Sequence, residues 1–438
     1  MNGYLVLVLH AHLPFVRHPE EGSFLEETWL FEAIAETYLP LLRVLSSLEK
    51  DSVPFKLTLS ISPTLTAMLQ DGLLQERFIG YCERMIELAG REVDRTRDNR
   101  LFHAMAQQYR SLHETNLREF VEKYDRDITR GFDYHYKRGR VEILATAATH
   151  AFLPLYIQHP PAVRAQIQAG VQAHARVFGK TARGFWLPEC GYAPGLETYL
   201  RDQGIDFTFV ATHGLVFGEQ RPRAGVYEPI TTPNGVSVFG RDHASTNAVW
   251  SADEGYPSDI SYRDFYRDIG HDLPLDYIGP YLPEGRIRMN TGFKYHAVTG
   301  KTDQKLPYDP DAAARKVAEH ADNFVYNLTK RVHRLSDLMR EQARPGAGGT
   351  RVPPPVITSP FDAELFGHWW FEGPMWLEAV IRRIAESDEI ALATPLDYLK
   401  EYPEHQISRP AFSSWGTKGY SEVWLDGSND WIYRHVHK

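Results

Sequence analysis

The feature that most constrains the fold is a set of short apolar runs separated by segments with helical periodicity. Each run is rich in β-branched and aromatic residues and is flanked by turn or helix-start residues, which predicts a buried strand. The seven runs are 4–10, 55–61, 141–146, 184–188, 207–212, 236–240 and 355–360. Strands that alternate with helices favour βα units and a parallel sheet. We therefore expect an α/β protein with a closed or nearly closed (β/α) barrel, although an open doubly wound sheet satisfies the same pattern.

Two connections between the predicted strands are too long for a single helix. Residues 64–137 are mostly helical and charged, which predicts a helical insertion within the barrel. Residues 241–354 combine an irregular, aromatic, Gly- and Pro-rich loop with a helix from about 311 to 342, which Asp309 caps. The barrel itself is expected to cover residues 1–400.

Composition limits the class of protein. The chain has 438 residues with 43% hydrophobic and 24% charged residues, which is typical of a globular protein with a sizeable core. The net charge of −9 argues against a nucleic-acid partner, which would need clustered Lys and Arg.

The two cysteines cannot form a disulfide framework. The N-terminus lacks the pattern of a signal peptide, and its apolar run is shorter than the about 20 residues that span a membrane. We expect a cytoplasmic protein that binds neither nucleic acid nor a membrane.

Aromatic residues favour one class of substrate. They make up 12% of the chain, and many occur in polar stretches such as "GHWWFEG" and "SSWGTKGY". Exposed rings beside polar groups suit the apolar faces of sugar rings, whereas the alternative is that each ring packs in a large core.

Ionisable side chains follow every predicted strand but the second. In a (β/α) barrel, functional groups come from the carboxyl ends of different strands and converge on one cleft. The strand-end residues are His10, His12, His150, Glu189, His213, Arg241, Asp242, His243 and Asp362.

Glu189 and Asp362 are the carboxyl pair that we select, because each directly follows an apolar strand. Cleavage of a glycosidic bond with retention needs a carboxylate nucleophile and a second carboxyl group as acid/base, about 5–5.5 Å apart. A carboxyl group among aromatic rings can have the raised pKa that a general acid requires. The alternative is that Asp362 only caps the next helix; Glu189 suits that role less, since Glu is not a favoured cap.

The histidines support a rival hypothesis. His10 and His12 alternate on a strand and therefore face the same side. With His150 or Asp242 they could bind zinc, as in a metal-dependent hydrolase or deacetylase, or they could bond to sugar hydroxyls or pack in the core. Cys190 is a poor nucleophile, because its carboxylate neighbour disfavours the thiolate.

Four motifs along the chain resemble conserved regions of glycoside hydrolase family 57, in that family's order. They are "HAHLP", "VEILATAATH", "GFWLPECGY" and "SPFDAELFGHWWFEG". The similarity covers essentially the whole chain. Within that family, the chain is most similar to the group of 1,4-α-glucan branching enzymes and AmyC-type amylases. Members of this group have comparable stretches at the positions of "WSADEGYP", "SSWGTKGY" and "NDWIYRH".

The resemblance implies an incomplete, TIM-like (β/α)7 barrel that acts on α-glucan without a metal or other cofactor. It implies that Glu189 is the nucleophile and Asp362 the acid/base. The residues implied to bind substrate are His10, His12, His150, Arg241, Trp250, Ser258, Trp370 and Trp415. At the position of Ser258 relatives often carry Gly, so a contact there would involve the backbone.

The resemblance also implies double displacement with retention of the α-configuration. Our first hypothesis is a branching enzyme that forms α-1,6 links; the alternatives are an α-amylase, a 4-α-glucanotransferase or a glucan-binding relative without turnover. Family members continue past "WIYRHVHK" into additional C-terminal helices. Residues 401–438 are thus expected to begin a C-terminal helical domain that is truncated in this chain.

Overall fold

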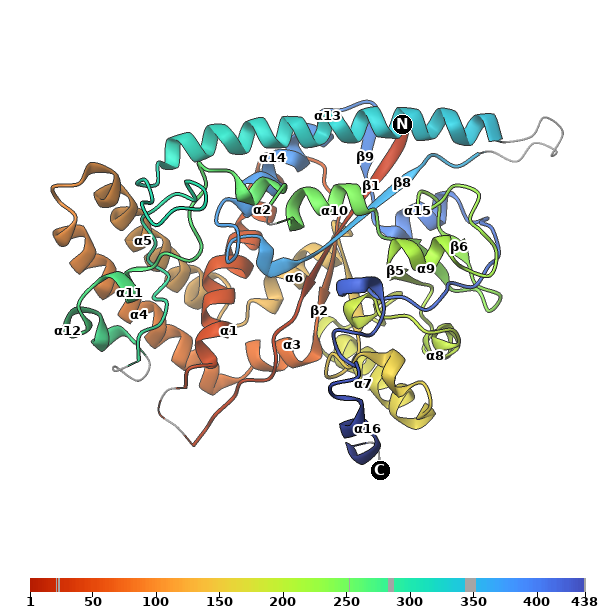
Figure 1. Ribbon diagram of the computed structural model, residues 1–438, viewed down its shortest axis with the longest axis horizontal. Helices are drawn as coiled ribbons and strands as arrows, with labels where there is room; N and C mark the ends of the chain where they lie inside the picture. The colour runs from red at the N-terminus through yellow and green to blue at the C-terminus, as the bar shows by residue number, and fades with distance from the viewer. Residues whose placement is uncertain (21, 23, 252, 283–286, 343–351, 437–438) are drawn as a thin grey trace.

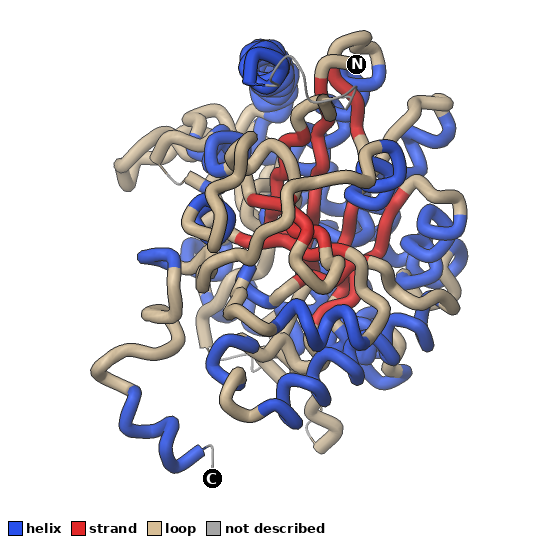
Figure 2. The backbone as a smooth tube through the Cα atoms, turned by 90° about the vertical axis from the view of Figure 1, so that its right-hand side faces the viewer, coloured by secondary structure: helices blue, strands red, loops and turns tan. Residues whose placement is uncertain are grey.

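The computed structural model describes residues 1–438 except 21, 23, 252, 283–286, 343–351 and 437–438. A curled sheet lies at its centre with helices around it, as Figure 2 shows. The strands of the described residues are β1 (Gly3–Ala11), β2 (Leu57–Ile61), β3 (Val141–Thr146), β4 (Gly184–Trp186), β5 (Phe207–Val210), β6 (Ile230–Thr231), β7 (Ser237–Gly240), β8 (Val356–Asp362) and β9 (Ile390–Leu392). All seven predicted strands are confirmed, and β6 and β9 are additional.

The strand order is β6-β7-β5-β4-β3-β2-β1-β8, and β9 pairs with the first residues of β1. Every pair is parallel except β6 with β7. The sheet curls until its ends meet just past β7, where Arg241 forms a bridge with Thr358 of β8. The Asp242 amide also donates to the Thr358 carbonyl over 2.8 Å. This nearly closed ring confirms the incomplete barrel and rules out the open doubly wound sheet.

Helices cover the outside of the barrel (Figure 1). Those of at least seven residues are α1 (Glu27–Ala33), α2 (Leu39–Lys50), α3 (Pro63–Leu69), α4 (Gly72–Arg95), α5 (Arg100–Arg118), α6 (Thr129–Lys137), α7 (Pro160–Phe178), α8 (Leu196–Asp202), α10 (His243–Trp250), α13 (Pro310–Gln342), α14 (Gly373–Ala385), α15 (Pro395–Glu401) and α16 (Asp430–Val436). A π-helical turn, η1 (Ile34–Tyr38), joins α1 to α2. No helix in the described part of the chain is long and apolar enough to cross a membrane.

The starts of α3 and α13 have the chemistry of helix caps. Ser62 accepts a hydrogen bond from the Leu65 amide ahead of Pro63, the first residue of α3. Asp309 accepts from the amide of Asp311 at the start of α13. That helix extends along one edge of the molecule (Figure 1) and buries Val317, Ala321, Phe324, Leu328 and Val332 on one face.

Two long excursions widen one side of the barrel. Between β2 and β3 the chain forms α3, α4, α5 and α6, and α4 and α5 lie at the left of Figure 1. The loop before α13 reaches the same side with two short helices, α11 (Ile269–Asp272) and α12 (Leu275–Ile278). Arg91 of α4 donates to the Tyr277 carbonyl and thereby ties the two excursions together. Part of this loop lies close to the carboxyl ends of the strands, where it helps to form the cleft described next.

Candidate active site

A cleft of about 520 Å³ opens at the carboxyl ends of the strands. Five of the strand-end residues selected from the sequence line it: His10, His12, His150, Glu189 and Asp362. His10 lies in β1 and His12 directly follows it, whereas the others come from the segments after β3 and β4 and from the last position of β8. The parallel sheet brings them together because His10 and Asp362 are register partners on β1 and β8.

The two selected carboxyl groups share this cleft and have altered acidities. Burial raises the pKa of Asp362 well above its ordinary value, and the negative charges of Glu364 and Glu189 raise it further against the opposing effect of Arg241. Burial also raises the pKa of Glu189, although the hydrogen bond from Trp415 lowers it. The Asp362 side chain makes no cap hydrogen bond to the following turn. Asp362 is therefore free to act as a proton donor rather than as a helix cap.

Trp415 holds Glu189 at two points. The indole Nε1 donates to Glu189 Oε2 over 2.8 Å, and the Trp415 amide donates to the Glu189 carbonyl over 2.9 Å. Arg241 lies 5.5 Å from the Trp415 ring centroid, and the ring of Trp250 meets that of Trp415 edge-on at 6.1 Å. Arg241, Trp250 and Trp415 therefore gather behind Glu189, and none of them is among the described residues that line the cleft itself.

The backbone at the site is strained. His150, Glu189 and Cys190 have φ angles of 56°, 62° and 51°, in the left-handed region that side chains with a Cβ rarely adopt. Each such conformation costs on the order of 1–3 kcal/mol and persists only where the surroundings enforce it. The Cys190 side chain is fully buried, and burial raises the pKa of its thiol, so the thiol stays protonated and does not reach the cleft.

The three histidines form a stack of neutral rings. His12 and His150 lie face to face with centroids 3.8 Å apart, and Nε2 of His10 is 2.9 Å from Nε2 of His150. Burial lowers the pKa of His12 to about 4 and that of His150 to about 3, and it lowers the pKa of His10 as well. At neutral pH these imidazoles carry no charge, so they can both donate to and accept from hydroxyl groups.

The stacking of the rings does not suit zinc. Ring nitrogens coordinate a metal in the plane of the ring, whereas His12 and His150 lie parallel with only 8° between their planes. Within the described residues, no group of three His, Cys, Asp or Glu side chains has the arrangement of a metal site. The geometry fits hydrogen bonding to a polyhydroxyl ligand better.

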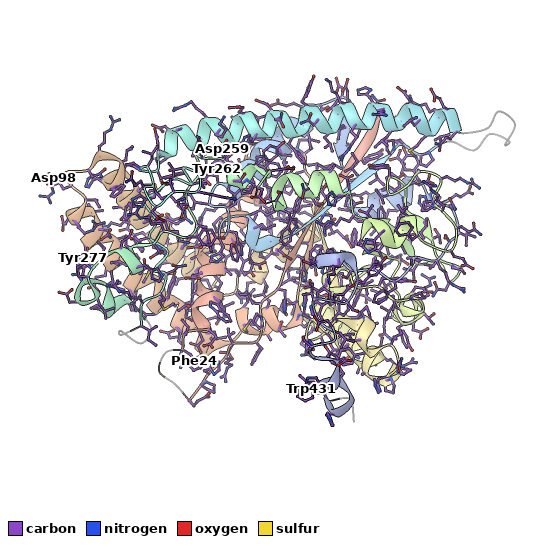
Figure 3. The ribbon with its side chains drawn as sticks, in the orientation of Figure 1. Phe24, Asp98, Asp259, Tyr262, Tyr277 and Trp431 are labelled. Atoms are coloured by element: carbon purple, nitrogen blue, oxygen red, sulfur yellow. The ribbon has the colours of Figure 1, made fainter. Side chains whose placement is uncertain are left out.

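Ser258 lies outside the cleft. It borders a separate hollow of about 380 Å³ together with Tyr256, Asp259 and His320. Its hydroxyl donates to the Gly255 carbonyl over 2.7 Å. Figure 3 labels the neighbouring Asp259 beneath α13. The structure thus does not bring Ser258 together with the other selected residues.

Trp370 requires a correction. Its side chain is only 2% exposed and packs against Tyr262 and Trp376, so it belongs to the core and does not face the cleft. The preceding residue, Trp369, is 51% exposed, lines the cleft and stacks on Phe265 with centroids 4.3 Å apart. The motif "GHWWFEG" thus contributes Trp369, and not Trp370, to the lining of the cleft.

Sequence reasoning missed a second group of charged residues in the cleft: Glu32, Glu36, Lys294, Glu364 and His368. Glu36 and His368 form an ion pair, with Nδ1 to Oε2 at 2.7 Å, and Tyr38 donates to Glu364 over 2.5 Å. The available signal was the spacing of Glu32 and Glu36, four residues apart in the largely apolar stretch 29–38, since residues at this spacing share one helix face.

Comparison with known proteins shows the family to which the chain is related. The model of glycosyl hydrolase family 57 matches residues 6–410. A 1,4-alpha-glucan branching enzyme of Thermococcus kodakarensis is 30% identical over 473 residues, covering 100% of this chain and 64% of its own length. The chain thus spans less than two thirds of that relative.

Two solved structures are also similar. The alpha-amylase AmyC from Thermotoga maritima is 45% identical, with a TM-score of 0.90 and coverage of 100% of this chain and 80% of its own. A GH57-type branching enzyme from Pyrococcus horikoshii is 30% identical, with a TM-score of 0.85 and coverage of 100% and 77%. Both the sequence motifs and the arrangement of the strands therefore lead to one conclusion: the chain belongs to glycosyl hydrolase family 57.

Proposed function

We propose that the protein is a retaining transglycosidase on α-1,4-glucan, a 1,4-α-glucan branching enzyme that forms α-1,6 links. One observation carries this proposal: two half-buried carboxyl groups with raised pKa, Glu189 and Asp362, line one cleft at the ends of separate strands. The relatives from Thermococcus kodakarensis and Pyrococcus horikoshii are branching enzymes, which supports the branching activity.

The first step forms a covalent intermediate. The Glu189 carboxylate attacks C1 of the donor sugar while Asp362 delivers its proton to the glycosidic oxygen, so that the C1–O bond breaks and a C1–Oε ester bond forms. The high pKa of Asp362 keeps its proton available for this step. The hydrogen bond from Trp415 to Oε2 orients the nucleophile and stabilises its charged form.

The second step transfers the sugar. An acceptor hydroxyl gives its proton to the Asp362 carboxylate and attacks C1, and the ester to Glu189 breaks. A 6-hydroxyl of glucan yields a branch, a 4-hydroxyl yields a longer linear chain, and water yields hydrolysis. The neutral imidazoles of His10, His12 and His150 would hold the hydroxyl groups of the donor sugar without adding charge near the nucleophile.

An α-amylase is the second candidate. It is favoured by the 45% identity and the TM-score of 0.90 with the amylase AmyC. The two activities use the same carboxyl groups and differ only in the acceptor.

Incubation of the purified protein with amylose, followed by proton NMR, tests the proposal. New α-1,6 anomeric signals without a matching rise in reducing ends support branching. New reducing ends without α-1,6 signals support the amylase, and changed chain lengths with neither support a 4-α-glucanotransferase. An unchanged polymer would identify a glucan-binding protein without turnover.

A further inference from the structure

The π-helical turn η1 interrupts the helix that α1 and α2 would otherwise form together. At this turn the Leu39 amide donates to the carbonyl of Ile34, five residues back instead of four. Pro40, the second residue of α2, explains the interruption. Its nitrogen has no hydrogen to donate to the Glu36 carbonyl, and in a regular α-helix its ring would clash with that oxygen. Turns of this kind are rare and frequently occur at functional sites.

The segment that follows β8 packs against this turn. Gly367 lies so close to the Glu36 carbonyl that a Cβ at this position would overlap the oxygen, and its φ of 114° also favours glycine. Before Gly367 in the chain, Glu364 accepts a hydrogen bond from the Tyr38 hydroxyl over 2.5 Å. After Gly367, Nδ1 of His368 pairs with Oε2 of Glu36 at 2.7 Å. The π-helical turn therefore holds the segment on both sides of this close approach.

Tyr38 acts from behind the cleft. Its side chain is 2% exposed and lies in the core beside Ile61 and Ala363, and it is not among the described residues that line the cleft. A buried tyrosine hydroxyl ordinarily finds some partner, so the bond by itself indicates only a satisfied core residue. The partner distinguishes this bond, because Glu364 is two residues beyond Asp362 in the chain.

The position of the Asp362 carboxyl group depends on the backbone that carries it. Asp362 is the last residue of β8, and its side chain makes no cap hydrogen bond to the following turn. On one side, this backbone is held by the pairing of β8 with β1, where His10 is the register partner of Asp362. On the other side, the bond between Tyr38 and Glu364 connects the turn to η1.

The turn after β8 is internally hydrogen-bonded. The Trp369 amide donates to the Glu364 carbonyl over 3.1 Å, and the Trp370 amide donates to the Leu365 carbonyl over 3.0 Å. These bonds join residues that are five apart, so the turn moves as one unit. A restraint on the Glu364 side chain is thus transmitted to Asp362 through a short, rigid stretch of backbone.

We infer that Tyr38 is a positioning residue for Asp362, because its hydroxyl, carried on the π-helical turn, fixes the turn after β8 through Glu364. Tyr38 itself does not contact the substrate. This inference rests on the proposed retaining mechanism and deepens it, since it names an element outside the strands that places the proton donor. Misplacement of a reacting group by about 1 Å can cost on the order of 100-fold in rate.

The test compares Tyr38→Phe with a matched control, Tyr277→Phe. Each substitution keeps the ring and removes one hydroxyl that donates to a glutamate, which for Tyr277 is Glu92 at 2.9 Å. Tyr277 lies in α12, which Figure 3 shows at the left of the molecule, and it does not line the cleft. The substrates are maltoheptaose, whose leaving oxygen needs a proton, and α-glucosyl fluoride, whose leaving fluoride does not.

Tyr38→Phe should lower kcat for maltoheptaose roughly tenfold or more, which is part of the 10²–10⁴-fold that general acid catalysis contributes. KM should change less than about threefold, because the surface that binds the sugar is intact. Fluoride release in the first turnover should also change less than about threefold, since that step needs no acid. Tyr277→Phe should match the parent protein on both substrates.

Equal losses on the two substrates would give Tyr38 a structural role only, and parent-like rates on both would show that the bond is not needed. Either result overturns the inference. If Tyr38→Phe does not fold, as judged by its thermal transition, Glu364→Ala decides by the same ratio of rates, because it removes the acceptor of the same bond at a half-buried position. If the parent protein hydrolyses maltoheptaose without branching it, the branching proposal is refuted, while the ratio still tests Tyr38, since hydrolysis needs the same acid.

Discussion

The indole N–H of Trp415 donates a 2.8 Å hydrogen bond to Oε2 of Glu189, across 226 residues of sequence. The same tryptophan also binds the Glu189 carbonyl through its backbone amide. These two bonds hold both the side chain and the backbone of Glu189, whose backbone is in the left-handed conformation. Trp415 thus positions the candidate nucleophile, a role that differs from the direct substrate binding implied by the family resemblance.

Trp415→Phe keeps the ring and removes the donor. Hydrogen bonds to charged groups contribute about 1.5–3 kcal/mol, so we expect kcat to fall roughly 10- to 150-fold with a smaller change in KM. The bond lowers the pKa of Glu189, so its loss raises that pKa and moves the acidic limb of the kcat/KM profile to higher pH. Trp431→Phe is the control, because that indole is 57% exposed and its N–H donates to the Ser428 carbonyl, away from Glu189. An unmoved acidic limb would refute the positioning role.

Asp362→Asn removes the proposed acid and base while preserving shape. General acid catalysis typically contributes 10²–10⁴-fold, so turnover of maltoheptaose should fall by about three orders of magnitude. Fluoride release from α-glucosyl fluoride, which needs no acid, should fall far less in its first turnover. Because Asp362 acts as acid below its raised pKa, the alkaline limb of the parent's pH profile should vanish in the variant. Equal losses on both substrates would contradict the assignment.

The lowered histidine pKa values predict a stability effect. The pKa of His150 is about 3 in the folded protein and about 6.5 when unfolded, so the unfolded state binds more protons as the pH falls below 6.5. The full stability is present above pH 6.5 and is lost progressively between there and pH 3. Between pH 7 and pH 5 this one residue should cost about 2 kcal/mol. Asparagine tolerates the left-handed backbone at this position, so His150→Asn should fold. Between pH 7 and pH 5 its free energy of unfolding, measured in urea, should fall by about 2 kcal/mol less than that of the parent protein. Equal losses in both proteins would show that His150 titrates normally.

The adjacent indoles give a matched pair of substitutions. Trp370→Ala removes a fully packed core ring and should lower the free energy of unfolding by about 3–5 kcal/mol. Trp369→Ala removes a half-exposed ring and should leave the thermal transition within a few degrees while weakening glucan binding. Isothermal titration with maltoheptaose and differential scanning calorimetry measure the two effects. The reverse pattern would restore Trp370 as the sugar-binding residue.

The strand framework was predictable because buried parallel strands are continuous apolar runs. Ile230–Thr231 and Ile390–Leu392 were missed because strands of two and three residues have no pattern that separates them from loops. The strand-end position of Glu189 and Asp362 follows directly from that framework. Lys294 could not be placed, since it reaches the cleft through the long loop before α13, whose path depends on tertiary packing. Trp369 and Trp370 could not be told apart, because no periodicity continues through the turn after β8.

The central claim is that Glu189 forms a covalent bond to the donor sugar. The direct measurement is mass spectrometry of the protein after reaction with a 5-fluoro-α-glucosyl fluoride, which slows the second step and lets the intermediate accumulate. We predict the added mass of one fluoroglucosyl group on the peptide containing residues 184–192, located on Glu189 and absent in Glu189→Gln. A label on any other residue, or turnover of this substrate without a labelled protein, would contradict the mechanism.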